Sequence, residues 1–359
     1  MDASLSILSK ALDVMPCVFQ GNPLNLLFVD AFEVVRETDA YVQQLASPQL
    51  MQEQRELLLE TPLGQAFYHT SFPKRPDPSD VSAMLFTRFD ALEAFLLSQD
   101  DIAAHLAQRV AQTAPDVVIY VVADGLSYYD LPDSPDTQPC FVKGPSITPH
   151  GYQAAIGKPS LSRRLFNGGY VRQSAYTYFD VDSNDLAGKL HSTFGTGQVQ
   201  RVREFKDIID HVKQTLGHGK TYLQVTTTAL DGLCHNHRDR PPVEAYKQKL
   251  LDNFDALLEV CSQNNRRVMA CLTADHGILW RDVVDFEVID APTADQTTHP
   301  RYLTGSRLRD YATTVRSDLG VYSLLRAPYV SRRLRSNEWG VHGGISAWES
   351  LVPLKIVIT

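Results

Sequence analysis

The sequence feature that most constrains the fold is VVIYVVA, an unbroken apolar run at positions 117–123. Such a run is typical of a strand that is buried on both faces of a parallel sheet. Two further segments repeat the pattern, TYLQVTTTALDG (221–232) and RVMACLTADHG (267–277), and LKIVIT (354–359) closes the chain. The sequence therefore predicts at least four strands of one buried sheet.

Helical stretches separate these predicted strands. REFKDIIDHVKQTLG (203–217) and VEAYKQKLLDNFDALLEVCSQN (243–264) carry apolar residues at helical spacing. The alternation of strand and helix predicts an α/β fold with a layered sheet. We place this sheet domain at residues 115–359.

The preceding region, residues 1–114, has a different character. Segments 24–46 and 51–69 carry apolar residues three and four positions apart, and 80–99 continues the pattern with Asp80 as a candidate cap. This pattern predicts a mainly helical N-terminal region. Its helices either form a docking surface for a protein partner or simply cap the sheet.

Composition and charge exclude several classes of protein. The 359 residues carry a formal net charge of −8, which argues against a surface covered with positive charge for non-specific DNA binding but leaves a local basic groove open. Five cysteines without the spacing of a disulfide framework predict free thiols and a cytoplasmic location. The N-terminus lacks the basic and apolar parts of a secretory signal, and no apolar run is long enough to predict a membrane span.

Three predicted strands are followed by an aspartate: Asp124, Asp231 and Asp275. Ligands of open α/β sheets bind at the carboxyl ends of the strands, where these carboxylates are expected. A single aspartate after a strand is usually a turn former or a helix cap. Three such residues in one domain, two of them accompanied by histidine, favour a shared ligand site.

Three histidines fit the same site. His276 directly follows Asp275, His235 lies one helical turn after Asp231, and His342 lies in GVHGGIS. Carboxylate oxygen and imidazole nitrogen are suitable ligands for Zn²⁺ or Mn²⁺, and six such groups are enough for two ions. Two further histidines are possible bystanders near the site: His237 and His299.

A hydroxyl nucleophile is available in PSITPHGYQAAIG (145–157). Pro149 fits the first position of a helix, which makes Thr148 a natural cap. Thr148 is either that cap alone or a hydroxyl placed where a helix N-terminus favours phosphate.

Four segments together resemble the PglZ domain of the alkaline phosphatase superfamily over roughly residues 115–359. They are VVIYVVADGLSY (117–128), PSITPHGYQAAIG (145–157), TADHG (273–277) and HGGISAWESLVPLKIV (342–357). The resemblance implies an alkaline-phosphatase-like sheet sandwiched by helices. It leaves the N-terminal helices unexplained.

The resemblance also implies a dinuclear site with two divalent metal ions, zinc or alternatively manganese. Its ligands would be Asp231, His235 and His342 for the first ion, and Asp124, Asp275, His276 and the Thr148 oxygen for the second. All seven positions hold a chemically competent residue.

The implied activity is that of a metal-dependent hydrolase. We expect a phosphodiesterase that acts on nucleotide or nucleic-acid-type diesters through a phospho-enzyme intermediate on Thr148. Gln153 or His150 is expected to donate a hydrogen bond to the phosphate. The chain departs from the family shortly after Asp124 and after Thr148, where relatives often carry arginine, and this difference concerns the substrate rather than the chemistry.

Two other functions stay open. The chain is alternatively a non-catalytic PglZ-type interaction module of a phage-defence or signalling system. It is also compatible with a phosphomutase or a phosphonate-cleaving relative. Turnover separates the module from the enzyme, because a scaffold with intact ligands still binds zinc.

Overall fold

A computed structural model describes residues 77–88, 96–134, 136–177, 183–215, 219–228, 230–235, 237, 239–289, 299–305, 308, 310–317 and 320–359. The helices predicted at 24–46 and 51–69 lie outside the described residues. No helix within the described ranges combines the length and the apolar character that a membrane span needs.

An eight-stranded sheet forms the centre of the molecule, in the order β1-β3-β15-β7-β2-β6-β4-β5. Its strands are β1 (Leu97–Ser98), β2 (Val117–Ala123), β3 (Thr137–Phe141), β4 (Val171–Thr177), β5 (Val199–Val202), β6 (Thr221–Thr227), β7 (Val268–Thr273) and β15 (Leu351–Ile358). The four strands predicted from sequence correspond to β2, β6, β7 and β15. Every residue of β2 is buried, as its unbroken apolar run predicts.

The sheet is mixed. Strands β7, β2, β6, β4 and β5 run parallel to one another, whereas β15 is antiparallel to both β7 and β3. Because β2 lies between β6 and β7, the carboxyl ends of these three strands are neighbours at one edge.

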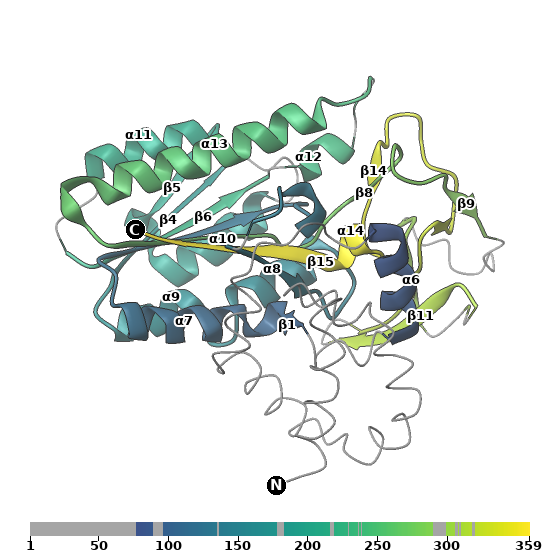
Figure 1. Cartoon of the computed structure of the whole chain (residues 1–359), viewed down its shortest axis with the longest axis horizontal. Helices are drawn as coiled ribbons and strands as arrows, with labels where there is room; N and C mark the ends of the chain where they lie inside the picture. The colour runs from purple at the N-terminus through teal and green to yellow at the C-terminus, as the bar shows by residue number, and fades with distance from the viewer. Residues whose placement is uncertain are drawn as a thin grey trace, which may run out of the picture.

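Helices cover both faces of the sheet, which confirms the predicted sandwich (Figure 1). Helices α11 (Phe205–Thr215) and α13 (Val243–Ser262) lie on one face, and both match the helices predicted from sequence. On the other face lie α7 (Ile102–Thr113), α8 (Thr148–Ile156) and α9 (Leu161–Asn167). Helix α10 (Ser183–Phe194) packs against β4.

The segment before residue 115 begins with α6 (Pro78–Arg88). This helix starts two residues before Asp80, and Asp77 rather than Asp80 accepts the hydrogen bond of the first turn, from the Ser79 N–H at 2.8 Å. The helix predicted over 80–99 is therefore correct at its start and wrong at 97–98, where β1 pairs with β3 in the main sheet. The predicted boundary at residue 115 stays a prediction, although β1 and α7 pack on the sheet domain.

Smaller elements lie beyond the carboxyl ends of the central strands. A three-stranded sheet contains β10 (Tyr302–Thr304), β11 (Ala312–Ser317) and β12 (Gly320–Leu325), and two pairs are formed by β8 (Leu279–Trp280) with β14 (Gly340–Val341) and β9 (Glu287–Val288) with β13 (Tyr329–Val330). Two short helices complete this region, α12 (Asp231–Cys234) and α14 (Ala347–Ser350).

Candidate metal centre

Three neighbouring strands bring three carboxylates to one edge of the sheet. Asp124 directly follows β2, Asp275 follows β7, and Asp231 begins α12 shortly after β6. Main-chain hydrogen bonds fix their backbones, because the Asp231 N–H donates to the Asp124 carbonyl at 3.2 Å. The structure thus places these side chains at the carboxyl ends of parallel strands, where a ligand site is expected.

Asp124, Asp275 and His276, called the inner group below, are almost completely buried. His276 Nε2 lies 3.5 Å from Asp124 Oδ1 and 3.8 Å from Asp275 Oδ2. Two backbone N–H groups donate to Asp275 Oδ1, that of His276 at 2.9 Å and that of Gly125 at 3.3 Å. One Asp275 oxygen is therefore held by the main chain, and the other lies near His276.

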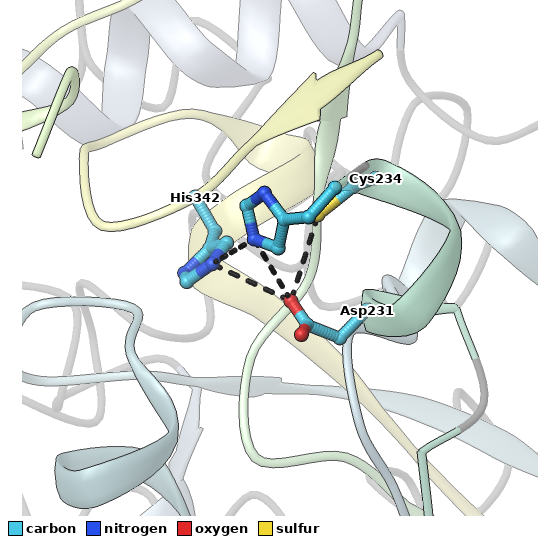
Figure 2. Close-up of side chains that lie close together, drawn as sticks. Asp231, Cys234 and His342 are labelled. Carbon is cyan, nitrogen blue, oxygen red and sulfur yellow. Dashed lines mark hydrogen bonds and ion pairs between the residues drawn. The ribbon is translucent and has the colours of Figure 1, made fainter. Parts of the chain in front are cut away.

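Asp231, His235 and His342, called the outer group below, are more exposed. His235 Nε2 lies 3.6 Å from Asp231 Oδ1, His342 Nε2 lies 3.4 Å from the same oxygen, and the two histidine nitrogens are 3.3 Å apart. Figure 2 shows Asp231 on α12 facing His342 of the loop after β14. This convergence of two nitrogens on one carboxylate oxygen suits a cation that accepts all three as ligands.

The two groups meet at their histidines. The rings of His276 and His342 stack with centroids 4.2 Å apart. Ligand atoms of Asp124, Asp231 and His276 all lie within 4.8 Å of one another. The structure thus brings together all six ligands that the sequence suggests.

Hydrogen bonds to the backbone orient two of the imidazoles. Nδ1 of His342 lies 2.8 Å from the Ser146 carbonyl oxygen, and Nδ1 of His276 lies 3.2 Å from the Gly277 carbonyl oxygen. Because a carbonyl can only accept, each Nδ1 is the donor in these bonds. Each Nε2 is then the ring nitrogen nearest the carboxylates, which is the arrangement found around protein-bound metals.

Thr148 lies beside the inner group. Its Oγ1 is 3.3 Å from His276 Nε2, and it is the first residue of α8. The cap of this helix is Ile147, which makes no side-chain capping bond, so the interpretation of Thr148 as the cap is wrong. Its hydroxyl is instead directed to the histidine, at the end of the helix that attracts anions.

Burial shapes the electrostatics of the carboxylates. It raises the pKa of Asp124 well above its usual range, and repulsion by Asp275 and Asp231 adds to the effect. Burial likewise raises the pKa of Asp275, although His276 opposes it. For Asp231, burial is outweighed by His342, His276 and His235, which together lower its pKa.

These charges fit a metal site. Burial and then His276 lower the pKa of His342 to about 3, so this imidazole is a neutral donor at neutral pH. Asp124 Oδ1 is buried and has no hydrogen-bond partner among the described residues, which costs free energy unless a ligand contacts it. Three crowded carboxylates with three imidazoles are a hard and borderline donor set for divalent cations.

Cys234 lies next to this set but differs in character. Its sulfur is 3.6 Å from Asp231 Oδ1, and the side chain is completely buried (Figure 2). Burial, and then the charge of Asp231, raises the pKa of the thiol well above its usual value. The thiol therefore donates to Asp231 as a neutral group, in agreement with the free thiols predicted from the cysteine spacing.

The two residues expected to contact phosphate line a separate cavity. His150 and Gln153 line a cavity of about 190 Å³ together with Lys143, Lys158 and Arg316. Neither Thr148 nor any of the six candidate ligands is among the described residues that line this cavity. His150 is two positions after Thr148, which is about 200° around a helix, so the two side chains leave α8 on opposite sides.

The positions of two features near the site could not be predicted from the sequence. His299, expected only as a bystander, lies with its ring centroid 5.2 Å from that of His342 and stacks on Tyr302. Arg301 and Glu349 form a completely buried, bidentate ion pair with distances of 2.9 and 2.7 Å. Glu349 also accepts the Gly344 N–H at 3.0 Å, so this pair holds the loop that carries His342.

Comparisons with known proteins give similar folds at low identity. No family model matches the sequence, and no curated protein sequence matches it. Among solved structures, the chain is similar to murine ectonucleotide pyrophosphatase/phosphodiesterase 5, with a TM-score of 0.38, 13% identity, and coverage of 66% of this chain and 87% of that chain. A protein in the alkaline phosphatase superfamily from Vibrio parahaemolyticus gives a TM-score of 0.33, 11% identity and 61% coverage of both chains.

A further similar structure is the C-terminal periplasmic domain of EptC from Escherichia coli, solved in complex with zinc. Its TM-score is 0.32 at 11% identity, and the match covers 46% of this chain and 64% of that domain. The chain therefore spans less than two thirds of the length of the Escherichia coli domain. What the site of this chain can do follows from its own side chains.

Proposed function

We propose that this chain is a metal-dependent phosphodiesterase of the PglZ type that acts on nucleotide or nucleic-acid-type diesters in the cytoplasm. The observation that carries the proposal is the position of the Thr148 hydroxyl, 3.3 Å from His276 Nε2 and at the first residue of α8. A nucleophile thereby lies next to six convergent metal ligands.

The two groups of ligands suit two ions. The outer group, Asp231, His235 and His342, would hold the first, and the inner group with Thr148 would hold the second. Divalent ions bound there supply Lewis acidity to a phosphoryl group and make a nearby hydroxyl or water a stronger nucleophile.

In the proposed reaction, Thr148 Oγ1 forms a bond to phosphorus, and the bond from phosphorus to the leaving alcohol oxygen breaks. The hydroxyl of Thr148 loses one proton and the leaving oxygen gains one. The intermediate is a phosphate diester of Thr148 that keeps the second ester group of the substrate. Water oxygen then forms a bond to phosphorus, the bond from Oγ1 to phosphorus breaks, one water proton restores the hydroxyl, and the phosphate monoester leaves. The first turn of α8 presents backbone N–H groups and the positive end of the helix dipole toward the phosphate.

The local charges favour a diester. Burial has the largest effect on the pKa values of Asp124, Asp231 and Asp275, and the next effects come from carboxylates or histidines rather than from Lys or Arg. A diester carries one negative charge and needs less positive charge than a doubly charged monoester. The site therefore matches the less charged substrate.

The test combines metal analysis with turnover of bis(p-nitrophenyl) phosphate. We expect about two equivalents of zinc or manganese, loss of activity with EDTA, and a loss on the order of 10⁴-fold or more for Thr148→Ala. Thr148→Ser is the matched control, since it keeps the hydroxyl and should retain measurable activity. Full activity of Thr148→Ala would refute the nucleophile, and bound metal without turnover on any phosphate ester would favour the interaction module.

A further inference from the structure

A second cavity, of about 530 Å³, lies at the N-terminal end of α13. Two of the three tryptophans of the chain, Trp280 and Trp348, line it together with Tyr129. Its volume is within the range of small-molecule sites, which are concave and largely aromatic or apolar. The rest of its lining comes from the loop before α13, the first turns of that helix and the segment after β8.

The two tryptophans differ in how far the cavity reaches them. Trp348 is partly exposed, whereas Trp280 is 6% exposed and its Nε1 is completely buried, without a hydrogen-bond partner among the described residues. A molecule in the cavity can therefore contact Trp348 but not the Nε1 of Trp280.

The charges around the cavity favour a neutral ligand. Lys247 Nζ lies 2.7 Å from Asp130 and 2.8 Å from Glu244, and Arg240 lies 2.8 Å from Asp282. Each cation of the lining is therefore already paired with a carboxylate. Such a cavity suits a planar, uncharged heteroaromatic ring better than a phosphate group.

The cavity shares its supporting segments with the metal centre. Trp280 ends β8, which pairs with β14, and β14 leads directly to His342. The Trp348 carbonyl lies against Gly277, where an added Cβ would be only 1.9 Å from that oxygen, and Gly277 follows His276. The strand of Trp280 therefore pairs with the strand that leads to His342, and the backbone of Trp348 contacts the residue that follows His276.

We propose that this cavity binds the purine base of a nucleotide-type substrate, stacked on Trp348. The choice of a nucleobase rests on the proposed function, whereas the preference for a neutral aromatic ring rests on the cavity alone. Stacking on an aromatic side chain needs no specific hydrogen bond, since every base has an aromatic face.

The experiment uses tryptophan fluorescence of the full chain in EDTA, so that binding is measured without turnover. We expect adenosine to quench the fluorescence saturably and ribose 5-phosphate, which lacks a base, to leave it unchanged. Trp348→Ala should weaken adenosine binding about tenfold, the size of a lost stacking contact. Trp280→Phe keeps an aromatic ring and removes an N–H that the cavity does not reach, so it should leave the affinity for adenosine nearly unchanged.

Trp339→Phe is the matched control, because Trp339 is the third tryptophan and does not line the cavity. It should leave the affinity for adenosine unchanged, and thermal melting checks that each variant is folded. Equal responses to adenosine and ribose 5-phosphate, or an unchanged affinity in folded Trp348→Ala, would overturn the inference. Diester hydrolysis without adenosine binding defeats the base site alone, and adenosine binding without hydrolysis defeats the proposed function alone.

Discussion

The inner and outer groups of the metal centre offer similar ligands in different surroundings. The side chains of Asp124, Asp275 and His276 are 6%, 2% and 0% exposed. Those of Asp231, His235 and His342 are 24%, 39% and 10% exposed. The inner group therefore has little contact with water, whereas the outer group is partly exposed to it.

The two groups are also held in place differently. Asp124 and Asp275 follow central strands, and main-chain hydrogen bonds fix them directly. His342 lies on a loop that depends on side chains, because Ser146 Oγ accepts the Gly343 N–H at 2.8 Å and Glu349 accepts the next N–H at 3.0 Å. The inner group is thus built by the sheet itself, and the outer group by a network that mutation can remove.

The largest expected effect comes from removing one histidine from each group, which tests the two groups separately. We expect His276→Ala and His235→Ala each to lose about 10³-fold in turnover, as loss of about 4 kcal/mol of stabilisation from a metal ion implies. His276 is buried, contacts both Asp124 and Asp275, and lies beside Thr148, so His276→Ala should be the more damaging.

Metal analysis by plasma mass spectrometry measures the same comparison. His235→Ala should keep about one equivalent, held by the inner group, and His276→Ala should keep less. Two retained equivalents in both variants would contradict the assignment of the histidines as ligands.

The next effect concerns the support of the outer group. Arg301→Ala leaves Glu349 as an unpaired buried charge, and such a loss typically lowers the free energy of unfolding by about 3–5 kcal/mol. Lys249→Ala is the control, because the side chains of Lys249 and its partner Glu204 are 55% and 42% exposed, and such an exposed pair is worth at most about 1 kcal/mol. Urea denaturation measures both, and equal losses would show that burial of the pair does not matter.

The difference between the groups also explains what the sequence could predict. The inner group was readable because an apolar run followed by an aspartate marks both a buried strand and its carboxyl end. The Arg301–Glu349 pair was not readable, since 48 positions separate its members and neither residue type is normally buried.

Helix α8 contains a feature that the sequence predicted correctly and an expected contact that is still a prediction. Pro149 correctly indicated the start of a helix, and the structure places Thr148 beside the metal ligands. The expectation that His150 contacts the same phosphate stays a prediction, although His150 lines a separate cavity and lies about 200° around the helix from Thr148. Gln153 lines the same separate cavity as His150.

A smaller effect tests how closely α8 lies against the inner group. A Cβ on Gly151 would be 1.9 Å from the Asp275 carbonyl oxygen, which is backbone and cannot turn away. Gly151→Ala should therefore lower stability by about 1–3 kcal/mol and displace Thr148, so that turnover falls as well. Thermal melting and the diesterase assay measure the two effects.

The same substitution at Gly188 is the control, because no atom lies within 4 Å of an added Cβ in helix α10. Gly188→Ala should stabilise the chain by about 0.5–1 kcal/mol and leave turnover unchanged. A similar response at both glycines would mean that the close approach of α8 to Asp275 is unimportant.

The smallest expected effect tests whether the outer group has three ligands or four. Cys234 lies within ligand distance of Asp231, His235 and His342, but its buried thiol donates to Asp231 Oδ1. Cys234→Ser keeps a donor at this position, so we expect two bound ions and a loss of turnover below about tenfold, the lower end for residues that support a ligand. Loss of one ion in Cys234→Ser would instead identify the sulfur as a fourth ligand, and the outer group would then be a closed tetrahedral site rather than one open to substrate.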